Sequence, residues 1–280
     1  MARADRDPSE MQSLPRREAP ARRSGRAFTL VELLVVIAII ALVVSLLMIA
    51  IPQVQRGARS AQCLSNQRAL NIGFVQYYGD QDGRFMGVDT DRSAWDWVRT
   101  PVGTPGETEK HLRDGRMWEY IGDARVYRSP FDPFPAPTVS PNANSAPGNT
   151  RMRTYSFNSF ISTGEGFMWN GPPNWQVNTM GKIPLPSETI MTSLEYDHRG
   201  YNINGFGIDV SGNAIWIDKI AAWHPGYWNF TFADGSTYSY RHMAKQKDVD
   251  YYMTLPSNGI FWPGPDYQWL RRKMAPGLFQ

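Results

Sequence analysis

Cysteine is almost absent from this chain, because Cys63 is the single cysteine in 280 residues. A lone cysteine excludes an intrachain disulfide, even in an oxidising compartment. Three states of Cys63 stay open: a small apolar core residue, an interchain bridge, or a free thiol. Since free cysteine is among the most buried residue types, we expect Cys63 in the core.

Metal-binding and catalytic patterns are also scarce. With four histidines and no His-x3-His or paired-cysteine spacing, a zinc site is a weak hypothesis. Its only candidate ligands are Asp197, His198, His224 and Asp234. The segment 80–83 (Asp-Gln-Asp-Gly) lacks the remaining ligands of an EF-hand calcium loop, so we expect a helix-terminating turn there, with a calcium site as the alternative. No Gly-x-Ser-x-Gly, Gly-rich phosphate loop or His-Glu-x-x-His occurs, and we expect neither enzymatic activity nor a cofactor.

Excess charge is confined to the first 27 residues. Seven arginines and four acids there account for the whole formal charge of +3, and the remainder of the chain is neutral. The basic excess therefore does not indicate a nucleic-acid partner. Arginines that precede an apolar span stay in the cytoplasm, so we expect everything after Ile51 to lie outside it, with the span in the inner (cytoplasmic) membrane.

One long apolar run is present. The nineteen residues from Leu33 to Ile51 carry no charge, and Ser45 is their only hydroxyl residue. About 20 apolar residues in a helix cross a hydrocarbon core of about 30 Å, which predicts a transmembrane segment at about 33–51. The run exceeds a signal-peptide core, and no small-x-small site follows it, so we expect it to be retained.

The junction before this run resembles the N-terminal motif of the type IV pilin and type II secretion pseudopilin superfamily. The resemblance rests on the segment 26–34, Arg-Ala-Phe-Thr-Leu-Val-Glu-Leu-Leu. It implies that a prepilin peptidase cuts between Ala27 and Phe28, removes the leader 1–27 and methylates Phe28. The family usually has Gly at the position of Ala27.

Glu32 immediately precedes the apolar run. A carboxylate at membrane depth costs about 2.5–3.5 kcal/mol, so such residues indicate function. Cleavage would create a positive α-amine on Phe28, one helical turn from Glu32, and the two groups could pair within one chain. The family resemblance implies that they pair across subunits. The alternative without an assembly role is that the Glu32 side chain only extends to the cytoplasmic interface of the membrane.

We expect the apolar helix to continue beyond the membrane, giving one helix over 28–78. Pro52 would kink this helix or mark the membrane exit. Apolar and small residues then recur every three or four positions, which predicts a narrow stripe that packs on the rest of the chain. The members of this stripe are Val54, Ala58, Ala61, Ser65, Ala69, Ile72 and Val75.

Residues 79–280 hold all ten tryptophans and suffice for one sizeable core. We expect an extracytoplasmic, β-rich domain, and hence an α+β, pilin-like fold for the whole chain. Helix is expected only over 111–120. An exposed loop over 130–150 and an irregular C-terminal segment from Pro256 complete the expectation.

Two hairpins are predicted in this domain, over 208–217 and over 228–241. Asp234-Gly235 between alternating runs is the strongest short hairpin signal. We expect Ala233 opposite Ser236, which assigns one face to the core. That core face contains Trp228, Phe230, Phe232, Thr237 and Ser239; the other face contains Asn229, Thr231, Tyr238 and Tyr240.

Nine residues separate His224 from Asp234-Gly235. This spacing is similar to the C-terminal signature of one large branch of prepilin-like proteins, whose ectodomain role is unknown. Four further segments resemble that branch, in the right order: 63–73, 129–132, 155–158 and 186–189. Where the branch commonly has cysteine before Pro130, this chain has Ser129. We expect His224 to be a structural hydrogen-bonding residue at the start of a strand, with ligand binding or recognition as the alternative.

Two functional hypotheses follow. In the first, the chain is a pseudopilin or minor pilin that joins other pilin-like subunits through its N-terminal helix in a secretion pseudopilus or pilus-like filament. In the second, the pilin-like stem tethers an extracytoplasmic binding module for polysaccharide or a partner protein. A change of Glu32 separates the two, because only the first requires assembly.

Overall fold

The computed structural model describes residues 28–90, 93–101, 106–134, 151–162, 177–196, 205–255 and 259–275. The chain forms two compact units, 1–52 and 53–280, which are described separately below. The predictions for Ala27, for most of the loop 130–150, and for Asp197 and His198 lie outside the described residues.

Helix α1 (Leu30–Asp80) is the longest element and agrees with the predicted helix over 28–78 within two residues at each end. The helix continues through Pro52, although proline removes one backbone hydrogen bond of the helix. The apolar residues of its first part are exposed in the unit 1–52, and their hydropathy and length fit a membrane span. The prediction that the helix stops near Asp80 is confirmed.

The stripe predicted for the second part of α1 is wrong. Val54, Ile72 and Val75 are 70%, 49% and 43% exposed. A different face is buried, formed by Cys63, Gln67, Leu70, Asn71, Gly73, Phe74 and Tyr77. The sequence analysis followed small and aliphatic residues, whereas the buried face combines large aromatics with two amides that bond the backbone of the sheet.

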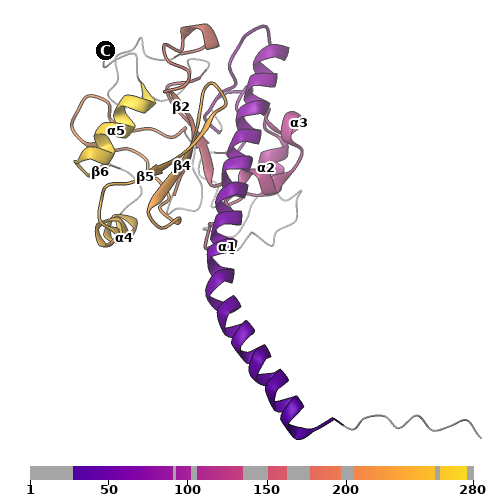
Figure 1. Ribbon diagram of the computed structural model, residues 1–280. Coiled ribbons are helices and arrows are strands. Elements are labelled where there is room, and N and C mark those ends of the chain that lie inside the picture. The colour runs from indigo at the N-terminus through magenta and orange to yellow at the C-terminus, as the bar shows by residue number, and fades with distance from the viewer. Residues whose placement is uncertain are drawn as a thin grey trace, which may run out of the picture. The chain divides into compact units, whose positions relative to one another are not determined.

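A four-stranded antiparallel sheet in the order β1-β2-β4-β5 forms the centre of the unit 53–280 (Figure 1). Its strands are β1 (Tyr155–Phe157), β2 (Ile190–Leu194), β4 (Tyr227–Phe232) and β5 (Thr237–Arg241). One face packs against the second part of α1, and the other against α5 (Pro265–Met274). This helix-and-sheet arrangement is α+β, as the sequence predicts.

The hairpin over 228–241 forms, but its register differs by one residue from the prediction. Trp228 pairs with Tyr240 and Phe230 with Tyr238, because the loop contains the three residues Ala233 to Gly235. Gly235 has φ +86°, which glycine adopts at little cost at this loop position.

The shift places Tyr238 and Tyr240 on the face of Trp228, Phe230 and Phe232, and moves Thr237 and Ser239 to the other face. The predicted division of β5 between the two faces is therefore wrong. Both faces of β4 are buried, since Asn229 and Thr231 lie on the α1 side of the sheet.

The helix expected over 111–120 is divided into α2 (Glu109–Arg113) and α3 (Trp118–Ile121). Gly115 separates them where the backbone of Trp97 and Val98 approaches closely. A Cβ at Gly115 would lie 2.2 Å from the Trp97 carbonyl oxygen. Two short 3-10 helices follow, at Ala124–Tyr127 and Met180–Lys182.

The hairpin predicted over 208–217 does not form as a pair of strands. Strand β3 (Ile215–Trp216) pairs with β6 (Ile260–Phe261). Two backbone bonds, from Asp209 N to the Ile215 carbonyl oxygen and from Asp218 N to the Gly207 carbonyl oxygen, still join the two predicted arms. The strand partner of β3 is therefore β6, a distant segment, and not the preceding residues 208–210 that the alternating pattern indicated.

The segment from Pro256 is also not irregular, since its described residues contain β6 and α5. Before it lies α4 (Gln246–Thr254), a helix that the sequence analysis did not predict. Pro265 stands at the first position of α5, where proline favours a helix start. Tyr267, Leu270 and Met274 are buried at spacings of three and four, as an amphipathic helix requires. We predicted an end to regular structure where the prolines in fact begin a helix.

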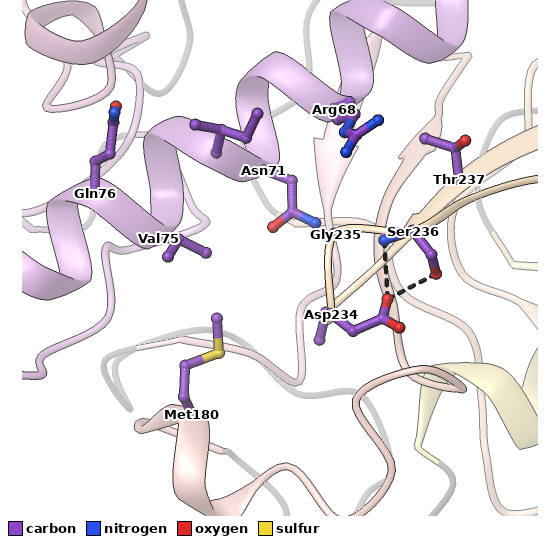
Figure 2. A pocket seen from close by; sticks show the side chains of 11 residues that line it. Arg68, Asn71, Val75, Gln76, Met180, Asp234, Gly235, Ser236 and Thr237 are labelled. Atoms are coloured by element: carbon purple, nitrogen blue, oxygen red, sulfur yellow. Dashed lines mark hydrogen bonds between the residues drawn. The ribbon is translucent and has the colours of Figure 1, made fainter.

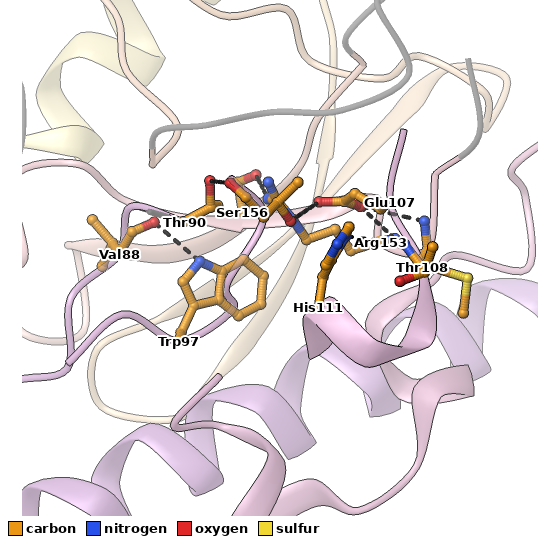
Figure 3. A network of polar contacts seen from close by, with 10 residues as sticks. Val88, Thr90, Trp97, Glu107, Thr108, His111, Arg153 and Ser156 are labelled. Carbon is orange, nitrogen blue, oxygen red and sulfur yellow. Dashed lines mark hydrogen bonds and ion pairs between the residues drawn. The ribbon is translucent and has the colours of Figure 1, made fainter. Parts of the chain in front are cut away.

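A buried ion pair joins Glu107 to Arg153, which precedes β1 (Figure 3). Arg153 Nε donates to Glu107 Oε1 at 2.7 Å, with the two side chains 2% and 1% exposed. Thr100 Oγ1 also donates to Glu107, and the Arg153 guanidinium lies 5.2 Å from the centre of the Trp97 ring. Partners on several sides fix both charges inside the core.

Lys219 is a second buried charge. Its side chain is fully buried, and Nζ donates to the carbonyl oxygens of Met253 and Leu255 at 3.1 and 2.5 Å. The ammonium lies 5.0 and 5.5 Å from the ring centres of Tyr196 and Tyr252. Burial lowers the pKa of Lys219 to about 8.

This shift predicts a pH dependence of stability. Between about pH 8 and pH 10 the folded state releases the Lys219 proton while the unfolded chain keeps it. The free energy of unfolding of the wild type, measured relative to Lys219→Met, should therefore rise with pH by up to about 1.4 kcal/mol per unit. Urea titrations of both proteins at intervals from pH 7 to pH 10 test this, and a flat difference would contradict it.

Candidate functional site

The start of α1 brings two of the sequence-predicted site residues together. Phe28 is 77% exposed and immediately precedes Thr29, which caps the helix. Glu32 Oε2 accepts hydrogen bonds from Thr29 N at 2.9 Å and Thr29 Oγ1 at 2.8 Å, while Glu32 N donates to Thr29 Oγ1. This is a reciprocal capping box.

The capping box is a feature that the sequence analysis missed. Its signal, Thr-x-x-Glu directly before an apolar run, is present at Thr29 and Glu32. Glu32 therefore has a local role, because it satisfies backbone groups at the first turn of α1. Capping requires only a hydrogen-bond acceptor at Glu32, whereas pairing with an amine requires its negative charge. The capping role and the assembly role of Glu32 can therefore be tested separately.

The first part of α1 presents apolar side chains on every side. None of its most apolar stretch is buried against other described residues of the unit 1–52. Ser45 satisfies its hydroxyl within the helix by donating to the Leu42 carbonyl oxygen at 2.7 Å. A helix that is apolar all round requires lipid or other helices around it.

His224 and Asp234 do not converge on one site. They lie just beyond opposite ends of β4, so the nine residues between them are this strand and its flanks. The His224 ring packs edge-on against Phe131 at 4.8 Å and Tyr227 at 5.4 Å between ring centres. Burial lowers the pKa of His224. The spacing is therefore explained by the length of one strand that lies against α1.

Asp234 and Gly235 instead border a groove against α1 (Figure 2). The groove has a volume of about 650 Å³ and lies between the β4–β5 loop, Met180 and the helix. Asn71 Nδ2 donates to the Phe232 carbonyl oxygen at 2.7 Å and joins the two sides. Asp234 Oδ1 accepts from Ser236 N and Ser236 Oγ, which fixes the loop conformation.

The groove therefore has a structural explanation. The Asp-Gly pair shapes the loop, and the loop holds the end of β4 against Asn71. The exposed Ile72 and Val75 side chains form one wall of the groove.

Cys63 is buried and free, as the core interpretation expects. Its Sγ atom lies 3.8 Å from Ser129 Oγ, which donates to it. Ser129, the position discussed in the sequence analysis, is therefore in direct contact with the single thiol.

This contact predicts that Ser129→Cys forms a disulfide with Cys63 in an oxidising compartment. The side chains already meet, and a bridge across so long a loop should add about 2–4 kcal/mol to the free energy of unfolding. Thiol titration and urea unfolding with and without reductant measure the effect, with Ser129→Ala as the control that cannot bridge. Two free thiols after oxidation would contradict the prediction.

Metal ligands do not gather in the described part of the chain, where no three His, Cys, Asp or Glu side chains lie close enough to hold an ion. Asp80 instead accepts a hydrogen bond from the Tyr120 hydroxyl at 3.1 Å. Asp82 and Gly83 both have positive φ, as a turn that ends a helix requires.

Comparison with known families identifies the N-terminal region. Residues 22–48 match the family described as the prokaryotic N-terminal methylation motif. No curated protein and no solved structure matches the chain. The match spans Ala27, Phe28 and Glu32 and supports a type IV pilin-like protein, anchored by a single membrane pass and processed by prepilin peptidase.

Proposed function

We propose that this protein is a structural subunit of a pilin-like filament, acting as a pseudopilin or minor pilin. Prepilin peptidase cleaves between Ala27 and Phe28 and methylates the new N-terminus. The mature chain stays in the cytoplasmic membrane through α1, with residues 79–280 outside the cytoplasm. It is the substrate of a processing enzyme and has no catalytic role of its own.

The observation that carries this proposal is the combination at the start of α1. The methylation motif ends in a helix whose exposed apolar surface is interrupted by one carboxylate, four residues from the cleavage position. In lipid, a carboxylate at this depth requires a partner, and the α-amine of Phe28 on a neighbouring subunit supplies one. Each subunit then offers one amine and one carboxylate.

Filament preparations test the proposal. In cells with prepilin peptidase, the protein should be recovered in the sheared or crosslinked filament fraction together with other pilin-like subunits. In cells without the peptidase, it should keep residues 1–27 and stay in the membrane as a monomer. Mature protein that is monomeric in cells with an intact assembly system would contradict the proposal.

A further inference from the structure

Another cavity of the unit 53–280 lies away from α1, among the C-terminal elements. It has a volume of about 440 Å³, within the range of small-molecule and side-chain pockets. Three segments form it: the residues after β5, the first turns of α4, and the connection from β6 into α5. Its lining includes Met243, Asp248, Tyr251, Trp262 and Asp266.

Apolar and aromatic side chains form the walls. Met243 and Tyr251 are 64% and 61% exposed, so a partner that enters the cavity can reach both side chains. Trp262 is held in place by an edge-on contact with the buried Tyr252 ring at 5.3 Å and by a backbone bond to Ala214. Methionine and aromatic residues are enriched at the centres of protein interfaces.

The charged residues that line the cavity are both acids. Asp266 is 2% exposed, and its carboxylate accepts hydrogen bonds from Tyr240 Oη, Met243 N and Ala244 N at 2.7–2.9 Å. Asp248 is half-buried and lies one helical turn from Tyr251 on α4. Lys245 and Lys247 precede Asp248 in sequence but do not line the cavity.

Helix N-termini offset part of this negative charge. Asp248 and Asp266 stand in the first turns of α4 and α5, where each helix end carries about half a positive charge. Two full carboxylates exceed these two half charges, and among the described residues no cationic side chain lines the cavity. Since three donors already occupy Asp266, the carboxylate left for a ligand is that of Asp248.

We propose that this cavity binds the side chain of an arginine or lysine presented by a partner protein. The methylenes of the side chain pack against Met243 and Trp262, and the cation contacts the face of Tyr251 and pairs with Asp248. This inference does not depend on filament assembly, because every residue that carries it lies in the C-terminal elements.

The test uses the full chain in detergent micelles and two peptides, N-acetyl-Gly-Arg-Gly-amide and its citrulline analogue. Citrulline has nearly the shape of arginine but no charge. Titration calorimetry in about 50 mM salt should show the arginine peptide binding at least about tenfold more tightly, and about 500 mM salt should weaken it. Equal affinities, or no binding of either peptide, would overturn the proposal.

Variants locate the binding. Asp248→Asn should lower the affinity for the arginine peptide about tenfold, whereas Asp250→Asn should leave it within about twofold. Asp250 is the matched control, since it lies on the same helix, bonds Gln246 and does not line the cavity. Tyr251→Ala should weaken binding and Tyr251→Phe should retain it, because both aromatic rings present a face.

Two outcomes would reassign the cavity. Equal losses in Asp248→Asn and Asp250→Asn would show a general effect of acidic charge. Binding of cellohexaose that depends on Tyr251, with no preference for the arginine peptide, would make this a site for neutral sugars. Either result overturns the proposal and leaves the function proposed for α1 untouched.

Discussion

Glu32→Gln should remove the protein from the filament fraction by a factor of about ten or more, while cleavage after Ala27 continues. The change keeps the size and most of the capping capacity of the side chain but removes its charge. A charge-assisted hydrogen bond contributes about 1.5–3 kcal/mol, which corresponds to about tenfold to a hundredfold in each subunit contact. Quantitative blots of sheared filament and membrane fractions measure the ratio.

Two controls separate charge from capping. Thr29→Val removes the hydroxyl that bonds Glu32 and should cost the helix about 1 kcal/mol while leaving the carboxylate, so incorporation should persist. Ser45→Ala removes the other polar side chain of the apolar segment and should have no effect. If Thr29→Val fails as severely as Glu32→Gln, capping is the role of Glu32 and intersubunit pairing is excluded.

Normal function of Glu32→Gln in cells would favour the second hypothesis, in which α1 only tethers a binding module. A tether needs the apolar span but not the carboxylate, so localisation and ligand binding would survive the change. The same variant therefore decides between the two hypotheses.

Arg153→Met should lower the free energy of unfolding of the unit 53–280 by about 3–5 kcal/mol. The substitution leaves Glu107 as a buried carboxylate whose charged partner is gone. It also removes the guanidinium from the face of Trp97. Urea unfolding followed by tryptophan fluorescence measures the loss.

A nearby ion pair supplies the matched control. Arg113 pairs with Glu109 on the surface of α2, so Arg113→Met should cost less than about 1 kcal/mol. Replacing both members of the buried pair, with Glu107→Leu and Arg153→Met together, should recover part of the loss because no unpaired charge remains. Equal effects of Arg153→Met and Arg113→Met would contradict the account of the buried pair.

Local patterns predicted the elements whose signals are continuous in sequence. The apolar run up to Ile51 predicted the first part of α1 from its length alone, because a helix that is apolar on every face shows no hydrophobic periodicity. The Asp234-Gly235 pair predicted the β4–β5 hairpin. The hairpin register was not accessible, since an Asp-Gly pair fits both a two-residue and a three-residue loop. One added residue moved Tyr238 to the opposite face.

The remaining errors arise from contacts between distant segments. The buried face of α1 is decided by the amides of Gln67 and Asn71, which bond the carbonyl oxygens of β4 more than 150 residues later. Hydropathy alone ranked these amides as surface residues. Likewise, β3 finds its partner in β6, and α5 begins at a proline that looked like a terminator.

The candidate site was only partly predictable. Glu32 was found because a carboxylate beside an apolar run is costly, but its bond to Thr29 was overlooked. The His224 and Asp234 spacing was noticed, yet only the structure relates it to the length of β4. The two carboxylates near Tyr251 and Trp262 lie on different helices, Asp248 on α4 and Asp266 on α5, and had no joint signal in sequence.

The most direct test of the central claim is the N-terminal residue of the protein purified from cell membranes. Intact mass and terminal peptide sequencing should show a chain that begins with N-methylated phenylalanine at position 28. A chain that still begins at Met1, in cells whose prepilin peptidase is active on other substrates, would contradict the account.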